Sequence, residues 1–146
     1  MFLLAGLAAY RWMLKRQSAG GAGMVLVGGG AVDPGGLELP HLPSLWSDDA
    51  IGPLKQMVDK VRPHGACFGM QLMHGGRQSY HDNKVAPSAI PAPAVVKGVP
   101  KALTLEEIDA LVAAFAQAAR RCREAGFDFI EIHAAHGYLI NQFMSP

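Results

Sequence analysis

The sequence predicts an α/β fold with a parallel sheet, organised as part of a (β/α)8 barrel. Three short apolar runs, at residues 24–27, 67–72 and 127–132, alternate with segments of helical periodicity. Parallel strands require such helical crossovers between them. Each apolar run is followed at once by glycines or polar residues, as in barrels whose sites gather residues from the carboxyl ends of several strands.

An open, doubly wound sheet is the competing architecture, and periodicity alone does not separate it from the barrel. No G-x-G-x-x-G motif follows a strand, because Gly28, Gly29 and Gly30 lack a further glycine at the required spacing. The different cluster at each strand end favours the barrel. The chain would then supply about three strands with their helices, roughly strands 2 to 4.

The first half of the chain predicts helix, strand and helix in that order. Residues 2–17 have helical periodicity, and residues 24–27 form a short apolar run bounded by glycines, which is typical of a buried strand. Ser47 or Asp48 can cap the next helix, and Gly65 is placed to end it.

The second half repeats the alternation. Residues 67–72 predict a second buried strand, and the proline-rich residues 78–103 have little periodicity and predict an irregular arm or hairpin. Residues 104–107 have the Thr-x-x-Glu pattern of a capping box and start a helix that runs to Gly126. Residues 127–132 predict the third strand.

Composition excludes several classes of function. With 50% hydrophobic and 17% charged residues, the chain has enough apolar material for a packed core. The 13 Lys and Arg residues against 12 Asp and Glu residues leave a net charge of +1, so nucleic acid is a poor candidate partner. We expect the two cysteines, Cys67 and Cys122, to be small buried apolar side chains that form no disulfide or metal site.

The apolar start of the chain predicts neither a membrane span nor a signal peptide. Only about nine residues precede Tyr10 and Arg11, whereas a span needs about 20. The positive charges follow the apolar stretch, while in a signal peptide they precede it. We therefore expect no membrane association and a cytoplasmic, reducing location.

The chemistry-bearing residues lie at the end of the third predicted strand. His133 and His136 could donate two hydrogen bonds to one carbonyl oxygen, stabilising the charge that develops when hydride adds to a conjugated alkene. Tyr138 could protonate the α-carbon. Alternatively, these are hydrogen-bonded strand-end residues, or the histidines are zinc ligands, although no nearby Cys or carboxylate cluster completes such a site.

Two further positions could contact a planar ring. The Gln71 amide, in an otherwise apolar strand, offers a donor and an acceptor to a ring edge, or is a buried amide bonded to a neighbouring strand. Gly28, Gly29 and Gly30 follow the first strand and would allow close backbone approach, or form only a turn. His74 and Arg77 are interpreted as structural polar residues of a loop.

Several motifs resemble one family in their order and spacing. The stretches are LWSD at 45–48, MQLMHGGR at 70–77, VAPSAI at 85–90, AGFD at 125–128 and EIHAAHGYLINQFMSP at 131–146. Together they resemble the Old Yellow Enzyme family of NADH:flavin oxidoreductases over roughly residues 10–146. The form is closest to members that are similar to enoate or 2,4-dienoyl-CoA reductases.

The resemblance implies a barrel that binds FMN and passes hydride from NADH or NADPH to the C=C bond of an enone or enoyl substrate. It implies that His133 and His136 bind the substrate oxygen, Tyr138 donates the proton, and Gln71 and Gly29 contact the flavin. The chain departs from the pattern at Gly28–Gly30, where many relatives have an acidic residue followed by a small one. FAD and an iron–sulfur cluster would belong only to further domains.

The resemblance also predicts that the chain is the N-terminal part of a flavin-binding barrel domain, truncated at both ends. The first strand and the phosphate-binding end of such a barrel would lie outside it, so we expect the 146 residues alone to be inactive, colourless and poorly soluble. The alternative is a short, non-catalytic interaction or structural module. The natural substrate and the choice between a monomer and a homo-oligomer stay open.

Overall fold

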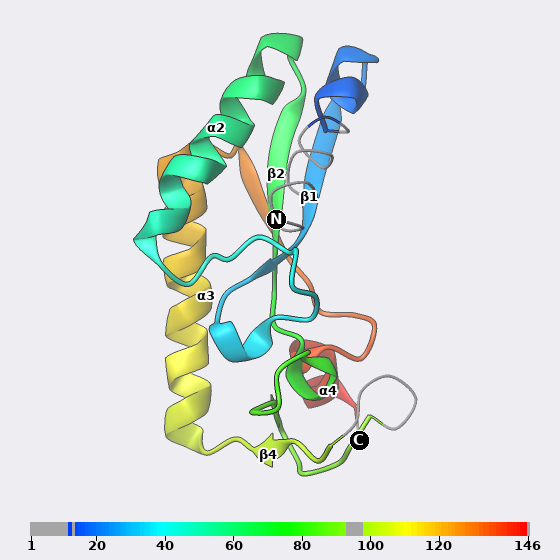
Figure 1. Ribbon diagram of the computed structural model, residues 1–146, viewed down its shortest axis with the longest axis vertical. Coiled ribbons are helices and arrows are strands. Elements are labelled where there is room, and N and C mark those ends of the chain that lie inside the picture. The colour runs from blue at the N-terminus through cyan, green and yellow to red at the C-terminus, as the bar shows by residue number, and fades with distance from the viewer. Residues whose placement is uncertain (1–11, 13, 93–97, 146) are drawn as a thin grey trace.

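Three parallel strands form the main sheet, in the order β1–β2–β5. The protein is represented by a computed structural model that describes residues 12, 14–92 and 98–145. The strands are β1 (Met24–Ala31), β2 (Cys67–Met73) and β5 (Phe129–Ile132), and the helices are α2 (Ile51–Val61), α3 (Leu105–Ala125) and α4 (Leu139–Met144). The parallel sheet with helical crossovers confirms the predicted α/β class (Figure 1).

Helices α2 and α3 cover one face of this sheet, where Figure 1 shows them side by side. Alternate strand residues, including Val27, Phe68, Met70 and Leu72, point into the core that they share with the helices. From α2 the core takes Leu54, Met57, Val58 and Val61, and from α3 it takes Ala118, Cys122 and Ala125. Each large buried side chain contributes about 1.5 to 3 kcal/mol of transfer free energy.

The opposite face of the sheet carries the strand residues that alternate with the core residues. Gly69 pairs with Phe129, and Gln71 pairs with Glu131. A Cβ atom on Gly69 would lie 2.2 Å from Cζ of Phe129, so the phenyl ring occupies the space that a side chain on β2 would need. A bulky residue on one strand is thus matched by a glycine on the next, as in the packed interior of a barrel.

The predicted helix limits agree with the capping residues. Ser47 accepts a hydrogen bond from the Asp49 N–H and begins the turn that leads into α2, and Gly65 follows that helix with a φ of 76°. Thr104 and Glu107 form the reciprocal bonds of a capping box at the start of α3. Gly126 ends α3 with a φ of 96°, which glycine adopts without a steric penalty.

The first strand is longer than predicted. It runs through the glycines to Ala31, with an irregularity in its pairing between Val27 and Gly30, so the glycines lie within the strand and do not follow it. A bulge allows this because Gly29 has a φ of 72°. Most of the helix predicted for residues 2–17 lies outside the described residues, and residues 14–19 are helical.

The segment 78–103 contains the short strands β3 (Val85–Ala86) and β4 (Lys101–Ala102). They pair in parallel, so they do not form the hairpin that was one of the two predictions for this segment. This pair is separate from the main sheet.

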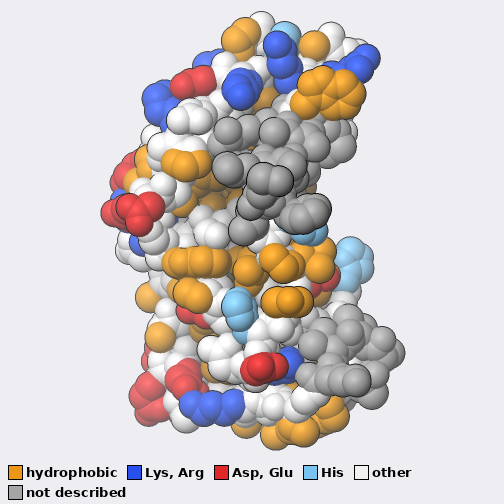
Figure 2. Space-filling model, viewed as in Figure 1, with side chains coloured by type: hydrophobic (Ala, Val, Ile, Leu, Met, Phe, Trp, Pro, Cys, Tyr) orange, Lys and Arg blue, Asp and Glu red, His pale blue; other side chains and the backbone are white. Residues whose placement is uncertain are grey.

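Helix α3 carries a stripe of apolar side chains that lie in two environments. Cys122 lies in the core, whereas Val112 is 65% exposed. The amino-terminal half of the stripe lines an apolar groove with β5 and α4, formed by Ile108, Leu111, Val112, Phe115, Ile132, Leu139, Ile140 and Phe143. Hydrophobic side chains also cross the middle of the face in Figure 2.

The two cysteines differ in burial, which corrects the prediction that both are buried. Both thiols are free; Cys122 is buried, and Cys67 is only half-buried because it starts β2 on the face opposite the helices. Burial raises the pKa of the Cys122 thiol to about 12. Among the described residues, no helix is long and apolar enough to cross a membrane.

Candidate active site

His133, His136 and Tyr138 face one another in the loop that joins β5 to α4. The ring centroids of the two histidines lie 5.0 Å apart, and the centroid of Tyr138 lies 4.8 Å from that of His133 and 6.4 Å from that of His136. His136 is exposed and the other two side chains are half-buried. The structure therefore gathers all three residues at the carboxyl end of the sheet.

Side chains from two other segments hold this loop in place. Nε2 of Gln78 donates to the His136 carbonyl at 2.9 Å, and Nε2 of Gln142 donates to the Gly137 carbonyl at 2.6 Å. The Gly137 N–H donates to Oδ1 of Asn141 at 2.8 Å. These bonds stabilise a turn in which His136 has a φ of 57°, a left-handed conformation that non-glycine residues seldom adopt.

The hydrogen bonds around the two histidines indicate which ring nitrogen of each carries the proton. The Ala135 N–H donates to Nδ1 of His133, so a neutral His133 carries its proton on Nε2. That Nε2 lies 3.3 Å from Nδ1 of His136, which therefore accepts the bond and carries its own proton on Nε2. Burial, followed by the neighbouring His136, lowers the pKa of His133 and favours this neutral form. An oxygen that took the place of the bond between the rings would meet the Nε2–H of His133, and His136 would donate to it only after its ring turns or its proton moves to Nδ1.

The phenol of Tyr138 is bound by an acidic residue from another loop. Its hydroxyl donates to Oε1 of Glu38 at 2.5 Å. Burial, and then the hydrogen bond to the Glu38 carboxylate, raises the pKa of Tyr138 well above its ordinary value. The phenol therefore stays protonated at neutral pH.

Gln71 lies at the centre of a polar connection across the three strands. Its Oε1 accepts a bond of 3.1 Å from the Gly29 N–H on β1, and its Nε2 donates to Oε1 of Glu131 on β5 at 2.5 Å. Both predicted flavin-contacting residues thus bind each other directly. One acceptor site on the amide oxygen and one N–H of the amide nitrogen are left for another partner.

His74 and Arg77 both lie in the loop that follows β2. The side chain of His74 is 1% exposed; Nδ1 accepts from the Gly76 N–H at 3.0 Å, and Nε2 lies 3.8 Å from Oδ1 of Asp33. Interaction with His74 lowers the pKa of the Asp33 carboxyl. The His74 ring also fills the space beside Gly36, where a Cβ atom would lie 2.4 Å from Cδ2 of the ring.

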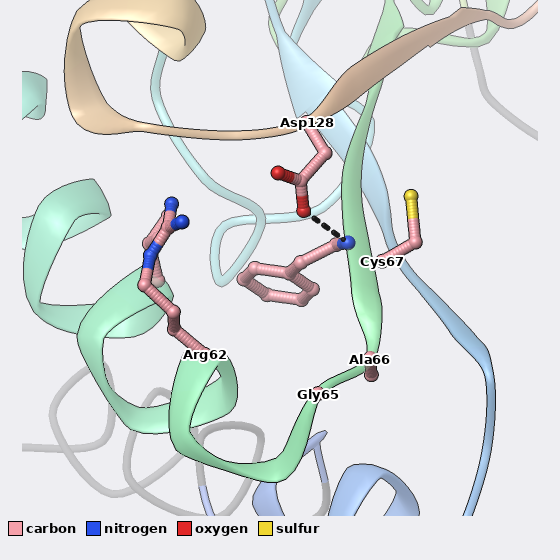
Figure 3. A pocket seen from close by; sticks show the side chains of 7 residues that line it. Arg62, Gly65, Ala66, Cys67 and Asp128 are labelled. Atoms are coloured by element: carbon pink, nitrogen blue, oxygen red, sulfur yellow. Dashed lines mark hydrogen bonds between the residues drawn. The ribbon is translucent and has the colours of Figure 1, made fainter.

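A separate pocket lies at the amino end of the strands (Figure 3). Its two charged side chains are already engaged, because Arg62 donates to the Gly126 carbonyl at 2.7 Å and Asp128 accepts from the Phe68 N–H at 2.8 Å. In α/β barrels this end stabilises the fold, and the chemistry occurs at the carboxyl end.

Within the described part of the chain, no cluster of three or more His, Cys, Asp or Glu side chains could hold a metal ion.

Comparison with known proteins agrees with this geometry. Residues 6–146 match the NADH:flavin oxidoreductase / NADH oxidase family. The chain belongs to this family. The Old Yellow Enzyme resemblance is thereby confirmed, together with FMN as the family's cofactor and a nicotinamide as its reductant.

Relatives in this family include two bacterial NADPH dehydrogenases. The protein from Geobacillus thermodenitrificans is 45% identical over 131 residues, and the protein from Listeria monocytogenes serotype 4a is 47% identical over 131 residues. Each alignment covers 89% of this chain and 38% of the relative. The chain thus spans well under half the length of these relatives.

Solved structures of the family show the same fold. Morphinone reductase superposes with a TM-score of 0.86 at 29% identity, over 94% of this chain and 42% of the other. Its complex with tetrahydroNAD gives a TM-score of 0.84, covering 90% and 42% of the two chains. These similarities support the prediction that the sheet and its helices form part of a (β/α)8 barrel.

The residues at the carboxyl end of this sheet fit the family's flavin. The pyrimidine edge of a flavin alternates donors and acceptors, and the remaining acceptor and donor of the Gln71 amide complement such an edge. Gly29 does not offer its N–H, because that group binds Gln71, so its contribution would be to orient the amide. A Cβ atom on Gly28 would meet only Oε1 of Gln71, at 3.8 Å, so Gly28 would permit close approach of a ring, whereas Leu42 and Met73 fill the space beside Gly29.

Several site residues were missed at the level of sequence. Glu38, Gln78, Glu131, Asn141 and Gln142 all bind site residues or their backbone. Glu131 could have been found, since it is a charged residue within the predicted third strand and lies two residues before His133. No local signal marks Glu38, which is 100 residues from its partner.

Proposed function

We propose that the protein is an ene-reductase that uses NADH or NADPH to reduce the C=C bond of an α,β-unsaturated carbonyl or enoyl compound. The observation that carries the proposal is the grouping of two histidine N–H donors and one protonated phenol at a single strand end. Bound FMN would supply the hydride that adds to the β-carbon. Morphinone reductase and the NADPH dehydrogenases support this reaction by membership of the same family.

The roles of the chain's own residues follow from their protons. His133 and His136 would each donate an N–H to the substrate carbonyl oxygen, once the bond between their rings is broken and the His136 ring turns its Nε2–H toward that oxygen. As negative charge develops on that oxygen, these donors stabilise it, an effect typically worth about 3 to 4 kcal/mol per donor. The Tyr138 hydroxyl would turn from Glu38 toward the substrate and transfer its phenolic proton to the α-carbon, and the phenolate would regain a proton from solvent.

Single-turnover reduction of 2-cyclohexenone by the complete gene product that contains these residues tests the proposal. In Tyr138→Phe we expect flavin reduction by NADPH to be unchanged and enone reduction to slow by about 10² or more, because general acid catalysis is lost. Tyr80→Phe is the matched control, since Tyr80 is 61% exposed and lies outside the site. Equal rates of enone reduction in wild type and Tyr138→Phe would exclude Tyr138 as the proton donor.

A binding experiment tests the two histidines separately. Phenolates imitate the enolate oxygen, so a substituted phenol should bind to the same two donors and perturb the flavin spectrum. In the double variant His133→Ala/His136→Ala we expect phenol affinity to fall while FMN stays bound. Replacing His64, which lies on the turn after α2, serves as the control.

Three related statements remain part of this proposal. Residues 1–146 form part of a flavin-binding barrel domain, with residues 78–103 as an arm within it. The substrate is a small molecule, and the free thiols of Cys67 and Cys122 are consistent with a reducing, cytoplasmic location.

A further inference from the structure

We propose that Glu38 is the positioning residue of Tyr138: its carboxylate accepts the hydrogen bond of the phenol and fixes the phenol oxygen at the edge of the site. The coupling between the two side chains is a property of the fold alone. Its consequence for catalysis rests on the proposed ene-reductase function.

The geometry joins two loops that lie at the carboxyl ends of different strands. Glu38 follows β1, and Tyr138 follows β5, so their bond of 2.5 Å connects the two outer strands of the sheet past β2. Both side chains are half-buried, which shields the bond from water without isolating it. A charge-assisted bond of this kind is about twice as strong as a neutral one.

The two residues before Glu38 are held by the loop that follows β2. The Leu37 carbonyl accepts from the Tyr80 N–H at 2.9 Å and from Oγ of Ser79 at 3.0 Å, and Ser79 is fully buried. The Gly36 carbonyl accepts from the Gly75 N–H at 2.7 Å. Glu38 is therefore presented by a backbone that is fixed before the phenol binds to it, as a positioning residue requires.

The surroundings of the Tyr138 phenol favour its protonated form. His133 and His136 face Tyr138 from its own loop, Glu38 faces it from the loop after β1, and Glu131 on β5 acts on His133. Burial first, and then Glu38, raises the pKa of Tyr138, since a phenolate beside a carboxylate would place two negative charges in contact. Glu38 thus opposes ionisation of the phenol at alkaline pH.

Two substitutions at Glu38 separate its effect on the position of the Tyr138 ring from the effect of its charge. Glu38→Gln keeps an oxygen that accepts the phenol hydroxyl but removes the charge, whereas Glu38→Ala removes both. We expect Glu38→Gln to hold the ring in place with a lower phenol pKa, and Glu38→Ala to lose the bond entirely. Glu106→Gln is the matched control, since Glu106 lies in the exposed first turn of α3.

The direct test is NMR of the complete gene product labelled with [13Cζ]tyrosine, with Tyr138→Phe used for assignment. At pH 7 we expect a downfield hydroxyl proton for Tyr138 in wild type, a smaller downfield shift in Glu38→Gln and none in Glu38→Ala. On raising the pH, Tyr138 should ionise at lower pH in Glu38→Gln than in wild type, while Tyr80 is unchanged. An identical Tyr138 titration and hydroxyl shift in wild type and Glu38→Gln would overturn the proposal.

The catalytic consequence is measured on the same variants. With 2-cyclohexenone, the alkaline loss of enone reduction should move to lower pH in both Glu38 variants, and Glu38→Gln should retain most of the neutral-pH rate that Glu38→Ala loses. An unchanged alkaline limb in both variants would also overturn the role of Glu38. If wild type reduces no enone but the NMR differences are found, the proposed function fails and the coupling of Glu38 to Tyr138 stands.

Discussion

Gln71 on β2 donates a hydrogen bond from Nε2 to Oε1 of Glu131 on β5, with the two atoms 2.5 Å apart. The oxygen of the same amide accepts from the Gly29 N–H on β1. If the oxygen and nitrogen of the Gln71 amide exchanged places, the oxygen would face the Glu131 carboxylate and the NH2 group would face the Gly29 N–H. The neighbouring strands therefore fix which edge of Gln71 is the donor.

This relationship predicts the effect of substitutions on FMN affinity. In Gln71→Ala we expect FMN to dissociate about 3- to 10-fold more readily, because a neutral hydrogen bond contributes about 0.5 to 1.5 kcal/mol net. Glu131→Ala should weaken FMN binding by up to the same factor, and Glu131→Gln should weaken it less, since glutamine can still accept from Nε2. Titration of FMN fluorescence measures these affinities, with Gln56→Ala, on the exposed face of α2, as control. Equal affinity in wild type and Gln71→Ala would contradict the assignment of Gln71.

Gly69→Ala should destabilise the fold by about 1 to 3 kcal/mol through overpacking. The added Cβ would lie 2.2 Å from the Phe129 ring, and both residues lie in paired strands with little freedom to move. Gly52→Ala in α2 is the control, because a Cβ there meets nothing within 4 Å and alanine favours the helix. Urea unfolding measures both, and Phe129→Leu combined with Gly69→Ala should recover part of the loss. A Gly69→Ala protein as stable as wild type would show that the ring does not occupy this space.

Gln142→Leu should disturb the turn at His136 and Gly137 more than the fold. Gln142 is 9% exposed; its side chain donates to the Gly137 carbonyl at 2.6 Å and accepts from the Arg77 N–H at 3.3 Å. Leaving these groups without a partner costs about 1 to 3 kcal/mol, concentrated on the loop that carries His136 and Tyr138. We expect slower enone reduction at unchanged FMN affinity, measured beside Gln56→Leu. Full activity of Gln142→Leu would contradict this role.

Asp33 should make stability depend on acidic pH. Its pKa in the folded protein lies below the ordinary value of 3.8, chiefly through His74, so the ionised form stabilises the folded state. This contribution is fully present above the ordinary pKa and is lost as the pH falls through the lowered one. We therefore expect the difference in unfolding free energy between wild type and Asp33→Asn to be constant above about pH 5 and to shrink below about pH 4. A difference that does not change with pH would contradict the lowered pKa.

The sequence alone determined the alternation of strands and helices, because apolar periodicity and caps are local. The Thr104–Glu107 capping box, Gly65 and Gly126 mark helix ends through contacts within one turn, and the structure has them in those roles. The clustering of His133, His136 and Tyr138 is also local, since all three lie within one loop. The family resemblance arises from the same contiguous motifs.

Only the tertiary structure decided which distant residues support the site. Glu38 meets Tyr138, and Gly29 and Glu131 meet Gln71, because parallel strands bring the ends of β1, β2 and β5 to one edge after crossovers of many residues. Strand register decided these partners, and no periodicity in the sequence encodes it. The continuation of β1 through its glycines likewise depends on pairing with β2, which overrides the weak strand preference of glycine.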